Sequence, residues 1–439
     1  MALDSRAIRR QFPFLQEREH PIYLDSAASA QKPECVLQAM DAFARRQYAN
    51  VHRGLYTLSE EATDMYEKSR ETVRAFLGAR HSDEIVFTKS ATESLNVAAR
   101  SWGYATLKKG DAVALSILEH HSAIVPWLQM KEEKGIEIIW IDIDDQGNVN
   151  REELSRALKK GNIKLVSVTG LSNVLGVRPP IKEMMTEVHR AGALMMIDAA
   201  QLVGHHKISV TATALPPWGE RPSEGGMREG EKLKFRDNPI SVQELDCDFL
   251  AFSGHKPYGP TGIGVLYARR ELLRNMPPFL GGGGMIREVR RDGFTSADAP
   301  QKFEAGTPPI TETVGLKAAL EWLASIGWHD IATYEAQLMT TAYATLKEIP
   351  GLRILGPQKP ADASGCVSFV IEGAHPHDLT DLLGQEGFCL RAGHHCAQPL
   401  HERLGVSASV RLSVGLYNTE EEIRALGPAI ARAMKVLIA

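Results

Sequence analysis

The sequence has no long uninterrupted apolar run and no large excess of charge of one sign. None of its apolar stretches approaches the length that a membrane-spanning helix needs, and residues 1–20 hold no apolar core of the kind found in a signal peptide. Lysine and arginine together number 50 against 54 aspartates and glutamates, a net charge of −4. This balance gives no electrostatic reason to expect binding to nucleic acid or to an anionic membrane surface. We therefore expect a cytoplasmic protein with no nucleic acid and no membrane among its partners.

Cysteine is scarce as well. The chain has five, an odd number with no C-x-x-C pair: Cys35, Cys247, Cys366, Cys389 and Cys396. This spacing argues against both a disulfide framework and a zinc knuckle. Cys396, in RAGHHCAQPL at 391–400, leaves three interpretations, which are a metal ligand, a buried thiol and a nucleophile. A metal would need a further ligand besides His394 and His395, and burial is the commonest state of a cysteine, so no metal site is predicted.

Short runs of apolar, often β-branched residues occur repeatedly before residue 270. They cover 84–88, 112–116, 136–143, 164–170, 193–199, 248–253 and 263–268. Segments with a helical pattern separate several of them, at 91–102, 122–134, 151–160 and 181–190. Alternation of strands and helices indicates an α/β domain with a mostly parallel sheet.

The pattern changes after residue 311. Two helical segments (311–325 and 331–348) precede strand candidates at 352–355, 367–371, 388–391 and 410–414 and a last helix at 420–437. We expect a large domain over 20–320 and a smaller α+β domain formed by 1–19 and 321–439. Residues 211–240 hold four prolines, four glycines and ten charged residues, without helix or strand period. They are expected to form a surface insertion, partly disordered, in the large domain.

Two polar residues stand at the carboxyl ends of predicted strands, where open α/β sheets bind ligands. Asp198 closes the run ALMMID. On its own it is most simply a turn former, and alternatively a buried anion that holds a cationic ring nitrogen. Lys256 follows DFLAFS in a turn rich in glycine and proline. Most lysines lie on the surface, but a lysine flanked by core strands has a lowered pKa and can form a Schiff base.

Three further candidates stand at strand ends. The segment TKSATESLNVA opens a predicted helix, with Ser90 and Glu93 spaced as a capping box. Its amides and the Thr92 hydroxyl suit a phosphate, although a plain helix cap is the simpler interpretation. His120 follows a strand and could stack on an aromatic cofactor or carry protons, and Asn173 also stands at a strand end, after 164–170. None of these signals is specific alone, but together with Asp198 and Lys256 they are what pyridoxal phosphate requires of a protein.

Ordered motifs along most of the chain are similar to those of a known family. They are YLDSAASAQKP at 23–33, YANVHRGLYTLSEEAT at 48–63, EHHSAIVPW, SNVLG, the spacing of Asp198 and Gln201, SGHKPYGPTGIG, FEAGTPP and RAGHHCAQP. They closely resemble group II cysteine desulfurases of the SufS type, from about Phe12 to the C-terminal helix, with 211–240 outside the likeness. The resemblance implies a homodimeric enzyme of pyridoxal 5′-phosphate fold type I. Its large domain would hold a seven-stranded, mostly parallel sheet, beside a smaller α+β domain.

The resemblance also implies roles for individual residues. Lys256 resembles the lysine that joins the cofactor, and Asp198 the partner of its pyridine nitrogen. The other implied cofactor contacts are Ala91, Thr92, Ser253 and His255 around the phosphate, Thr307 from the other protomer, and His120, Asn173 and Gln201 at the ring. Arg411 resembles the arginine that binds the substrate carboxylate, with Arg391 and His52 at further substrate-binding positions.

The implied reaction makes Cys396 a nucleophile. Sulfur is removed from L-cysteine to give L-alanine and a persulfide on Cys396, with Lys256 or a relay through His120 taking the α-proton. The persulfide then passes to an acceptor protein of SufE or SufU type for iron–sulfur cluster assembly. Selenocysteine lyase, cysteine-sulfinate desulfinase and kynureninase-like activities remain alternatives, as does a catalytically silent scaffold or metal-binding protein. The chain departs from the family pattern at Tyr56, where a histidine is usual, and at Ala91, where a threonine is common.

Overall fold

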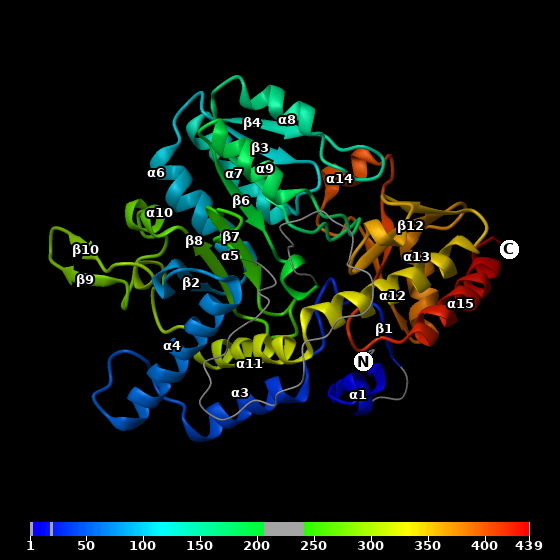
Figure 1. The fold of residues 1–439 in the computed structure, drawn as a ribbon, viewed down its shortest axis with the longest axis horizontal. Coiled ribbons are helices and arrows are strands. Elements are labelled where there is room, and N and C mark those ends of the chain that lie inside the picture. Colours follow the sequence, from blue (N-terminus) through cyan, green and yellow to red (C-terminus); the bar gives the residue numbers. More distant parts are fainter. Residues whose placement is uncertain (1–2, 18–20, 206–240, 439) are drawn as a thin grey trace, which may run out of the picture.

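The computed structural model describes residues 3–17, 21–205 and 241–438, so the predicted insertion 211–240 lies outside the described residues. Its larger sheet has seven strands in the order β2-β8-β7-β6-β5-β3-β4 (Figure 1). They are β2 (Ile85–Thr88), β3 (Ala112–Ser116), β4 (Glu137–Ile141), β5 (Ile163–Thr169), β6 (Leu194–Asp198), β7 (Phe249–Ser253) and β8 (Gly264–Ala268). β3 to β7 run parallel, whereas β8 is antiparallel to both of its neighbours. The predicted strands and the mostly parallel sheet are confirmed.

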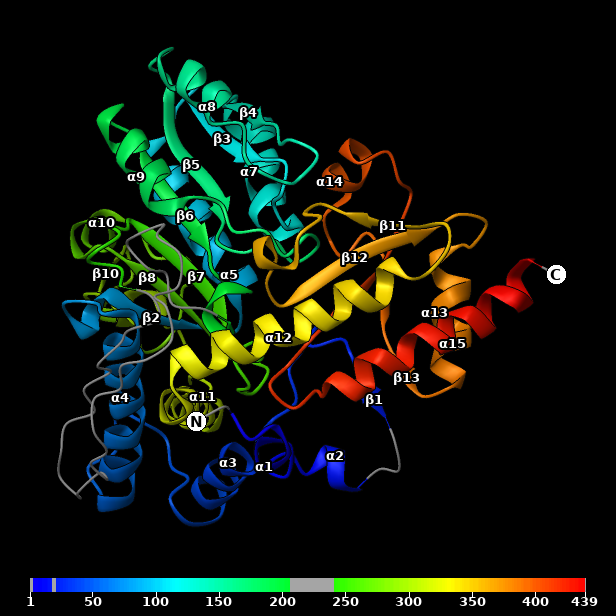
Figure 2. The same cartoon turned by 45° about the vertical axis from the view of Figure 1, so that its right-hand side comes forward.

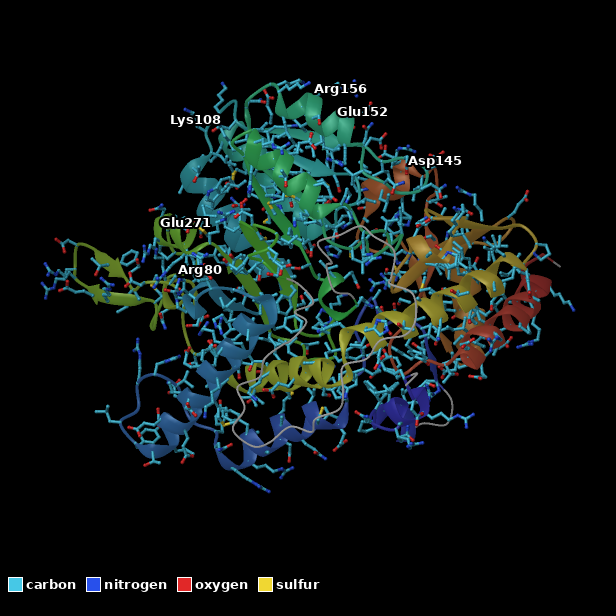
Figure 3. All side chains as sticks on the ribbon, in the orientation of Figure 1. Arg80, Lys108, Asp145, Glu152, Arg156 and Glu271 are labelled. Carbon is cyan, nitrogen blue, oxygen red and sulfur yellow. The ribbon has the colours of Figure 1, made fainter. Side chains whose placement is uncertain are left out.

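Both faces of this sheet are buried. Along β3, Val113 and Leu115 belong to one apolar cluster and Ala112 and Ala114 to another. Successive side chains of a strand point to opposite faces, so an unbroken apolar run marks a strand covered on both sides. The covering segments include α5 (Ala91–Val97), η2 (Ala98–Gly103), α6 (Tyr104–Thr106), α7 (His121–Lys134), α8 (Arg151–Leu158), α9 (Ile181–Arg190) and α10 (Arg270–Asn275). The outer side of α8 is polar, with the labelled Glu152 and Arg156 directed away from the sheet (Figure 3).

A second sheet is antiparallel, in the order β11-β12-β15-β14. Its strands are β11 (Leu352–Leu355), β12 (Cys366–Ile371), β14 (Arg391–Gly393) and β15 (Ser409–Ser413). The helices α12 (Trp328–Lys347), α13 (Pro376–Gln385) and α15 (Glu420–Ile438) lie beside it, and α14 (Gln398–Arg403) stands closer to the large sheet (Figure 2).

The predicted single strand 388–391 is wrong. Phe388–Cys389 forms β13, which pairs in parallel with β1 (Ile22–Tyr23), whereas Arg391 begins β14 in the antiparallel sheet. The two short strands therefore have different partners, and the partner of β13 comes from the opposite end of the chain. A local apolar pattern carries no information about such a partner, which is why the run looked continuous.

The remaining segments frame the two sheets. They are α1 (Ser5–Arg9), α2 (Phe14–Glu17), α3 (Glu34–Arg46), α4 (Thr57–Leu77), η1 (Ser82–Glu84), η3 (Leu202–Gly204), η4 (Gln301–Phe303), α11 (Ile310–Ile326) and η5 (Pro360–Asp362). A hairpin of β9 (Ile286–Val289) and β10 (Phe294–Ser296) projects from the body (Figure 1). The predicted domain boundary at 320/321 falls inside α11, and the division into 20–320 against 1–19 with 321–439 stays a prediction. In the part of the chain that the structure describes, no helix has both the length and the apolar character to cross a membrane.

Candidate active site

The carboxyl ends of β6 and β7 bring Asp198 and Lys256 to the same edge of the large sheet. Asp198 is buried, and burial raises its pKa to about 6, although a backbone amide hydrogen bond and the charge of Lys256 oppose the shift. The Lys256 ammonium donates hydrogen bonds to the carbonyl oxygens of Ala27 and Ala28. Burial lowers the pKa of Lys256 to about 7, and the positive charge of Arg411 acts in the same direction. A lysine that is partly neutral at neutral pH can attack a carbonyl carbon.

The start of α5 is joined to the end of β7. Ser90 caps the helix as predicted, since its hydroxyl accepts a hydrogen bond from the Glu93 amide at 3.3 Å. The Ala91 amide donates to Ser253 Oγ at 2.8 Å. Gly264 permits this close approach, because a Cβ at that position would lie 2.4 Å from the Ser90 carbonyl carbon. Backbone amides at the helix start and a strand-end hydroxyl are thereby brought together, a combination suited to an anion.

Two further predicted phosphate ligands carry neutral polar groups. Thr92 Oγ1 and Ser122 Oγ share a hydrogen bond at 2.8 Å. His255 Nδ1 lies 3.3 Å from Ser29 Oγ. Burial lowers the pKa of His255 to about 4, and the charge of Lys256 lowers it further, so its imidazole is neutral at neutral pH.

His120 caps α7 through its side chain. Its Nδ1 accepts a hydrogen bond from the Ser122 amide at 3.1 Å. Burial lowers the pKa of His120 to about 4, and the charge of nearby Lys256 acts in the same direction. The ring is therefore neutral and carries its proton on Nε2, the tautomer in which Nδ1 can accept. A neutral imidazole beside Lys256 can stack on a planar ligand and exchange a proton with it.

Cys396 lies in a tight turn whose two central residues are both left-handed. A backbone hydrogen bond of 2.9 Å closes the turn 394–397, and φ is 49° at His395 and 58° at Cys396. Residues other than glycine adopt this region only at an energetic cost, so surrounding contacts must hold them there. Asn173 Nδ2 donates to His395 O at 2.6 Å, and the His121 amide donates to Cys396 O at 2.8 Å. The turn is thus fastened to the segments that follow β3 and β5 in the large sheet.

Arg411 lies directly opposite Arg391 in the pairing of β15 with β14. It is 1% exposed. Its Nη2 donates to Asp25 Oδ1 at 2.9 Å and its Nη1 to Asn173 O at 3.0 Å, while Nε finds no acceptor among the described residues. A buried guanidinium with a remaining N–H can bind a carboxylate.

Two acidic residues near this cluster were not predicted, Asp25 and Glu119. Asp25 begins a segment whose Ala27 carbonyl accepts a hydrogen bond from Gln201 Nε2 at 2.7 Å. Glu119 is fully buried and accepts a hydrogen bond from the Thr169 amide at 2.9 Å, and burial raises its pKa to about 8. Both could have been found by the pattern that identified Asp198, an acidic residue at the end of a short apolar run.

The described contacts of His52 are with residues of α4, outside this cluster. The His52 ring packs against Tyr66, with centroids 5.5 Å apart, and its Nε2 lies 3.6 Å from Glu67 Oε1. Thr307 is exposed, three residues after Glu304. The contribution predicted for Thr307 is to a second protomer. Within residues 3–17, 21–205 and 241–438, no group of three or more histidine, cysteine or acidic side chains could hold a metal ion.

Comparison with known proteins gives the family. The model of the aminotransferase class-V family matches residues 22–215 and 234–426. The chain belongs to that family. Residues 216–233, which separate the two matched segments, lie within the predicted insertion 211–240. The predicted fold and the broader family are therefore confirmed, whereas the group II, SufS-type subclass stays a prediction.

Individual members of the family are similar over the whole chain. A probable cysteine desulfurase of Streptomyces coelicolor is 40% identical over 97% of this chain and 96% of its own length. A cysteine desulfurase of Synechococcus elongatus is 40% identical over 98% of this chain, which spans 64% of that relative. The crystal structure of an Escherichia coli cysteine desulfurase, in an S-sulfonic acid form, has a TM-score of 0.84 and 37% identity, with 100% of both chains covered.

Proposed function

We propose that this class-V family member is a pyridoxal phosphate-dependent cysteine desulfurase. It removes sulfur from L-cysteine, gives L-alanine and leaves a persulfide on Cys396. The observation that carries the proposal is the attachment of the Cys396 turn to Asn173 and His121, at the same sheet edge as Asp198 and Lys256. Sulfur transfer requires a thiol held close to the cofactor-binding edge of the sheet. Kynureninase-type chemistry has no use for such a thiol. The names of the similar proteins support the same substrate.

The residues present fit pyridoxal phosphate. Lys256 supplies an amine of lowered pKa, and Asp198 a buried carboxyl group that can accept a hydrogen bond from a ring nitrogen. The other residues that would hold the group are Ala91, Thr92, Ser253 and His255 at the phosphate and His120, Asn173 and Gln201 at the ring. When bound, the cofactor supplies an electron sink for the pair released at the substrate Cα.

The protein's own side chains divide the remaining tasks. Arg411 binds the carboxylate of cysteine and fixes its orientation. Lys256 takes the proton from Cα, and His120, neutral with its proton on Nε2, holds or passes a proton beside it. The thiolate of Cys396 attacks the substrate sulfur, so that an S–S bond forms and the C–S bond breaks. The electron pair of the C–S bond stays with carbon, which is then protonated to the methyl group of alanine.

The proposal includes partners and location. A homodimer would let Thr307 of one protomer complete the phosphate cup of the other, and its exposed position supports this assignment. Arg391 and His52 are the further substrate-binding positions of the proposal. A protein of SufE or SufU type would accept the sulfur for iron–sulfur cluster assembly in the cytoplasm.

The test is mass spectrometry of Cys396 after L-cysteine is added to the holoenzyme. We expect a gain of one sulfur atom on Cys396 and stoichiometric alanine. Cys396→Ser should keep the visible absorbance of the bound cofactor and lose alanine formation, because a hydroxyl is a far poorer nucleophile for sulfur. Cys35→Ser, which changes an exposed thiol on α3, is the matched control. Alanine formation at the wild-type rate in Cys396→Ser would rule out the persulfide route.

Lys256→Ala tests the cofactor assignment separately. The variant should show no visible absorbance that borohydride removes, and no turnover, because no amine remains to join the cofactor. Normal absorbance and turnover in Lys256→Ala would contradict the assignment.

A further inference from the structure

Three buried polar side chains form a hydrogen-bond chain behind the Cys396 turn. They are His395 in the turn, Ser409 in β15 and His401 in α14, which are 4%, 0% and 1% exposed. Ser409 Oγ lies 3.1 Å from His395 Nε2 and 2.9 Å from His401 Nε2. His401 Nδ1 lies 2.9 Å from the carbonyl oxygen of Ala397, the last residue of the turn. The chain therefore connects a central residue of the turn, His395, and its last residue, Ala397, to a strand of the antiparallel sheet.

The chemistry of the groups determines which atom donates and which accepts in each hydrogen bond of this chain. His401 Nδ1 must donate, because the Ala397 carbonyl can only accept. Burial lowers the pKa of His401 and lowers that of His395 to about 2, so both rings are neutral. His401 Nε2 then accepts the Ser409 hydroxyl proton, and Ser409 Oγ accepts from His395 Nε2–H. Each hydrogen bond in the chain has one possible direction, which fixes the orientation of the His395 ring.

The position of Ser409 connects this chain to substrate binding. Ser409 and Arg411 are two residues apart in β15, so their side chains lie on the same face of the strand. In the facing strand β14, Gly393 lies opposite Ser409 and Arg391 opposite Arg411. Strand β15 thus carries both Arg411, the proposed carboxylate-binding residue, and Ser409, whose hydroxyl contacts His395 in the Cys396 turn.

The other described bonds to the turn reach only its backbone. Asn173 and the His121 amide hold the carbonyl oxygens of His395 and Cys396. A left-handed turn without glycine persists only where its surroundings over-determine it. The chain through Ser409 adds a hydrogen-bonded constraint on the side-chain side of the turn, separate from the bonds made by Asn173 and the His121 amide.

We propose that Ser409 and His401 are positioning residues for Cys396, which hold the turn, through His395, in the form that presents the thiol to the sulfur of bound cysteine. The inference rests on the proposed function and deepens it. In this proposal Ser409 and His401 act only through the geometry of the turn, by the contacts that they make with His395 and Ala397. Losing the chain should free the turn, so that the thiol becomes easier for a small reagent to reach and harder to use in catalysis.

The test uses the holoenzyme with Ser409→Ala and, separately, His401→Phe. Persulfide formation on Cys396 is followed by mass spectrometry in a single turnover, and alkylation of the same thiol by iodoacetamide is followed without substrate. Both variants should form the persulfide about tenfold more slowly, a barrier change of about 1.4 kcal/mol, and be alkylated several-fold faster. Visible absorbance of the cofactor should not change. Opposite changes in two rates at one sulfur atom are not expected from general loss of stability.

The matched control is Tyr343→Phe. It removes a buried hydrogen bond, from the Tyr343 hydroxyl to Pro357 O at 2.9 Å, elsewhere in the same part of the fold, and both rates should match the wild type. The buried Cys247 and Cys366 report on unfolding in every sample.

Two results would overturn the proposal. One is wild-type values for both rates in both variants. The other is alkylation of Cys247 and Cys366 along with Cys396, which would show that the hydrogen-bond chain supports the fold as a whole. Failure of the proposed function looks different, because wild-type Cys396 would then take no sulfur from cysteine while the alkylation rates still test the chain.

Discussion

Removing the carboxylate of Glu304 should destabilise the protein strongly, although Glu304 touches neither thiol nor lysine of the proposed site. Its two oxygens accept hydrogen bonds from Arg70 at 2.7 and 2.9 Å, from the Phe87 amide at 2.7 Å and from the Tyr66 hydroxyl at 3.1 Å. The side chains of Arg70 and Glu304 are 1% and 7% exposed. Among the described residues, Glu304→Ala would leave the buried guanidinium with Glu67 as its one ionic partner and the buried Phe87 amide without an acceptor.

The magnitude follows from burial. Breaking a buried ion pair by removing one partner costs about 3–5 kcal/mol, because the remaining charge stays out of water. The partly exposed Glu67 remains paired with Arg70 and reduces this cost, whereas the Phe87 amide, left without an acceptor, adds about 1–3 kcal/mol to it. We therefore expect a loss of about 3–5 kcal/mol in the free energy of unfolding. By the same reasoning, Arg70→Met combined with Glu304→Leu should cost less than the sum of the two single changes.

The assay is urea denaturation followed by circular dichroism, with Glu288→Ala as the control. Glu288 forms an exposed ion pair with Arg290 in the β9–β10 hairpin, and losing such a pair costs about 0–1 kcal/mol. Since Glu304 also anchors the loop that leads to Thr307, cofactor affinity should fall in Glu304→Ala as well. A loss of stability no larger than that of Glu288→Ala would refute the argument, as would strictly additive effects in the double variant.

Two further predictions concern the site itself. Arg411→Lys keeps the positive charge but loses the planar guanidinium that binds a carboxylate through two hydrogen bonds, so KM for cysteine should rise at least about tenfold while the cofactor absorbance stays normal. An unchanged KM would indicate that Arg391, not Arg411, binds the substrate carboxylate. Cofactor uptake by the apoprotein should depend on neutral Lys256, whose pKa is lowered to about 7. The uptake rate should therefore rise about tenfold per pH unit below that value and level off above it, whereas a rise that continues to the ordinary lysine range would contradict the lowered pKa.

The parts of the fold that the sequence predicted are those encoded by local pattern. Each run of the large sheet is apolar on both faces because it is covered on both faces, so composition alone marks it. Asp198 and Lys256 stood out because each ends or follows such a run in a polar turn. Their meeting at one edge follows from parallel topology, which the alternation of strands and helices implied.

Features that depend on pairing between distant segments were not predictable. The division of 388–391 into β13 and β14 depends on β1, near the other end of the chain. The ion pair of Asp25 with Arg411 joins residues 386 positions apart, and that of Arg70 with Glu304 joins residues 234 apart. In each case the local sequence shows only an ordinary acid or arginine, and the partner is supplied by the register of strands and helices.

The histidines next to Cys396 show most directly what could not be predicted from the sequence. In the sequence, His394 and His395 looked equivalent, as two imidazoles that directly precede the thiol. In the structure, His395 is buried, neutral and bonded to Ser409, so it cannot serve as a cation for the thiolate. Its part is geometric, and it depends on a hydroxyl in β15 that the sequence presents only as one more polar residue in a strand. The chemistry expected of Cys396 thus follows from its motif, whereas the form of its turn depends on which strand packs behind it.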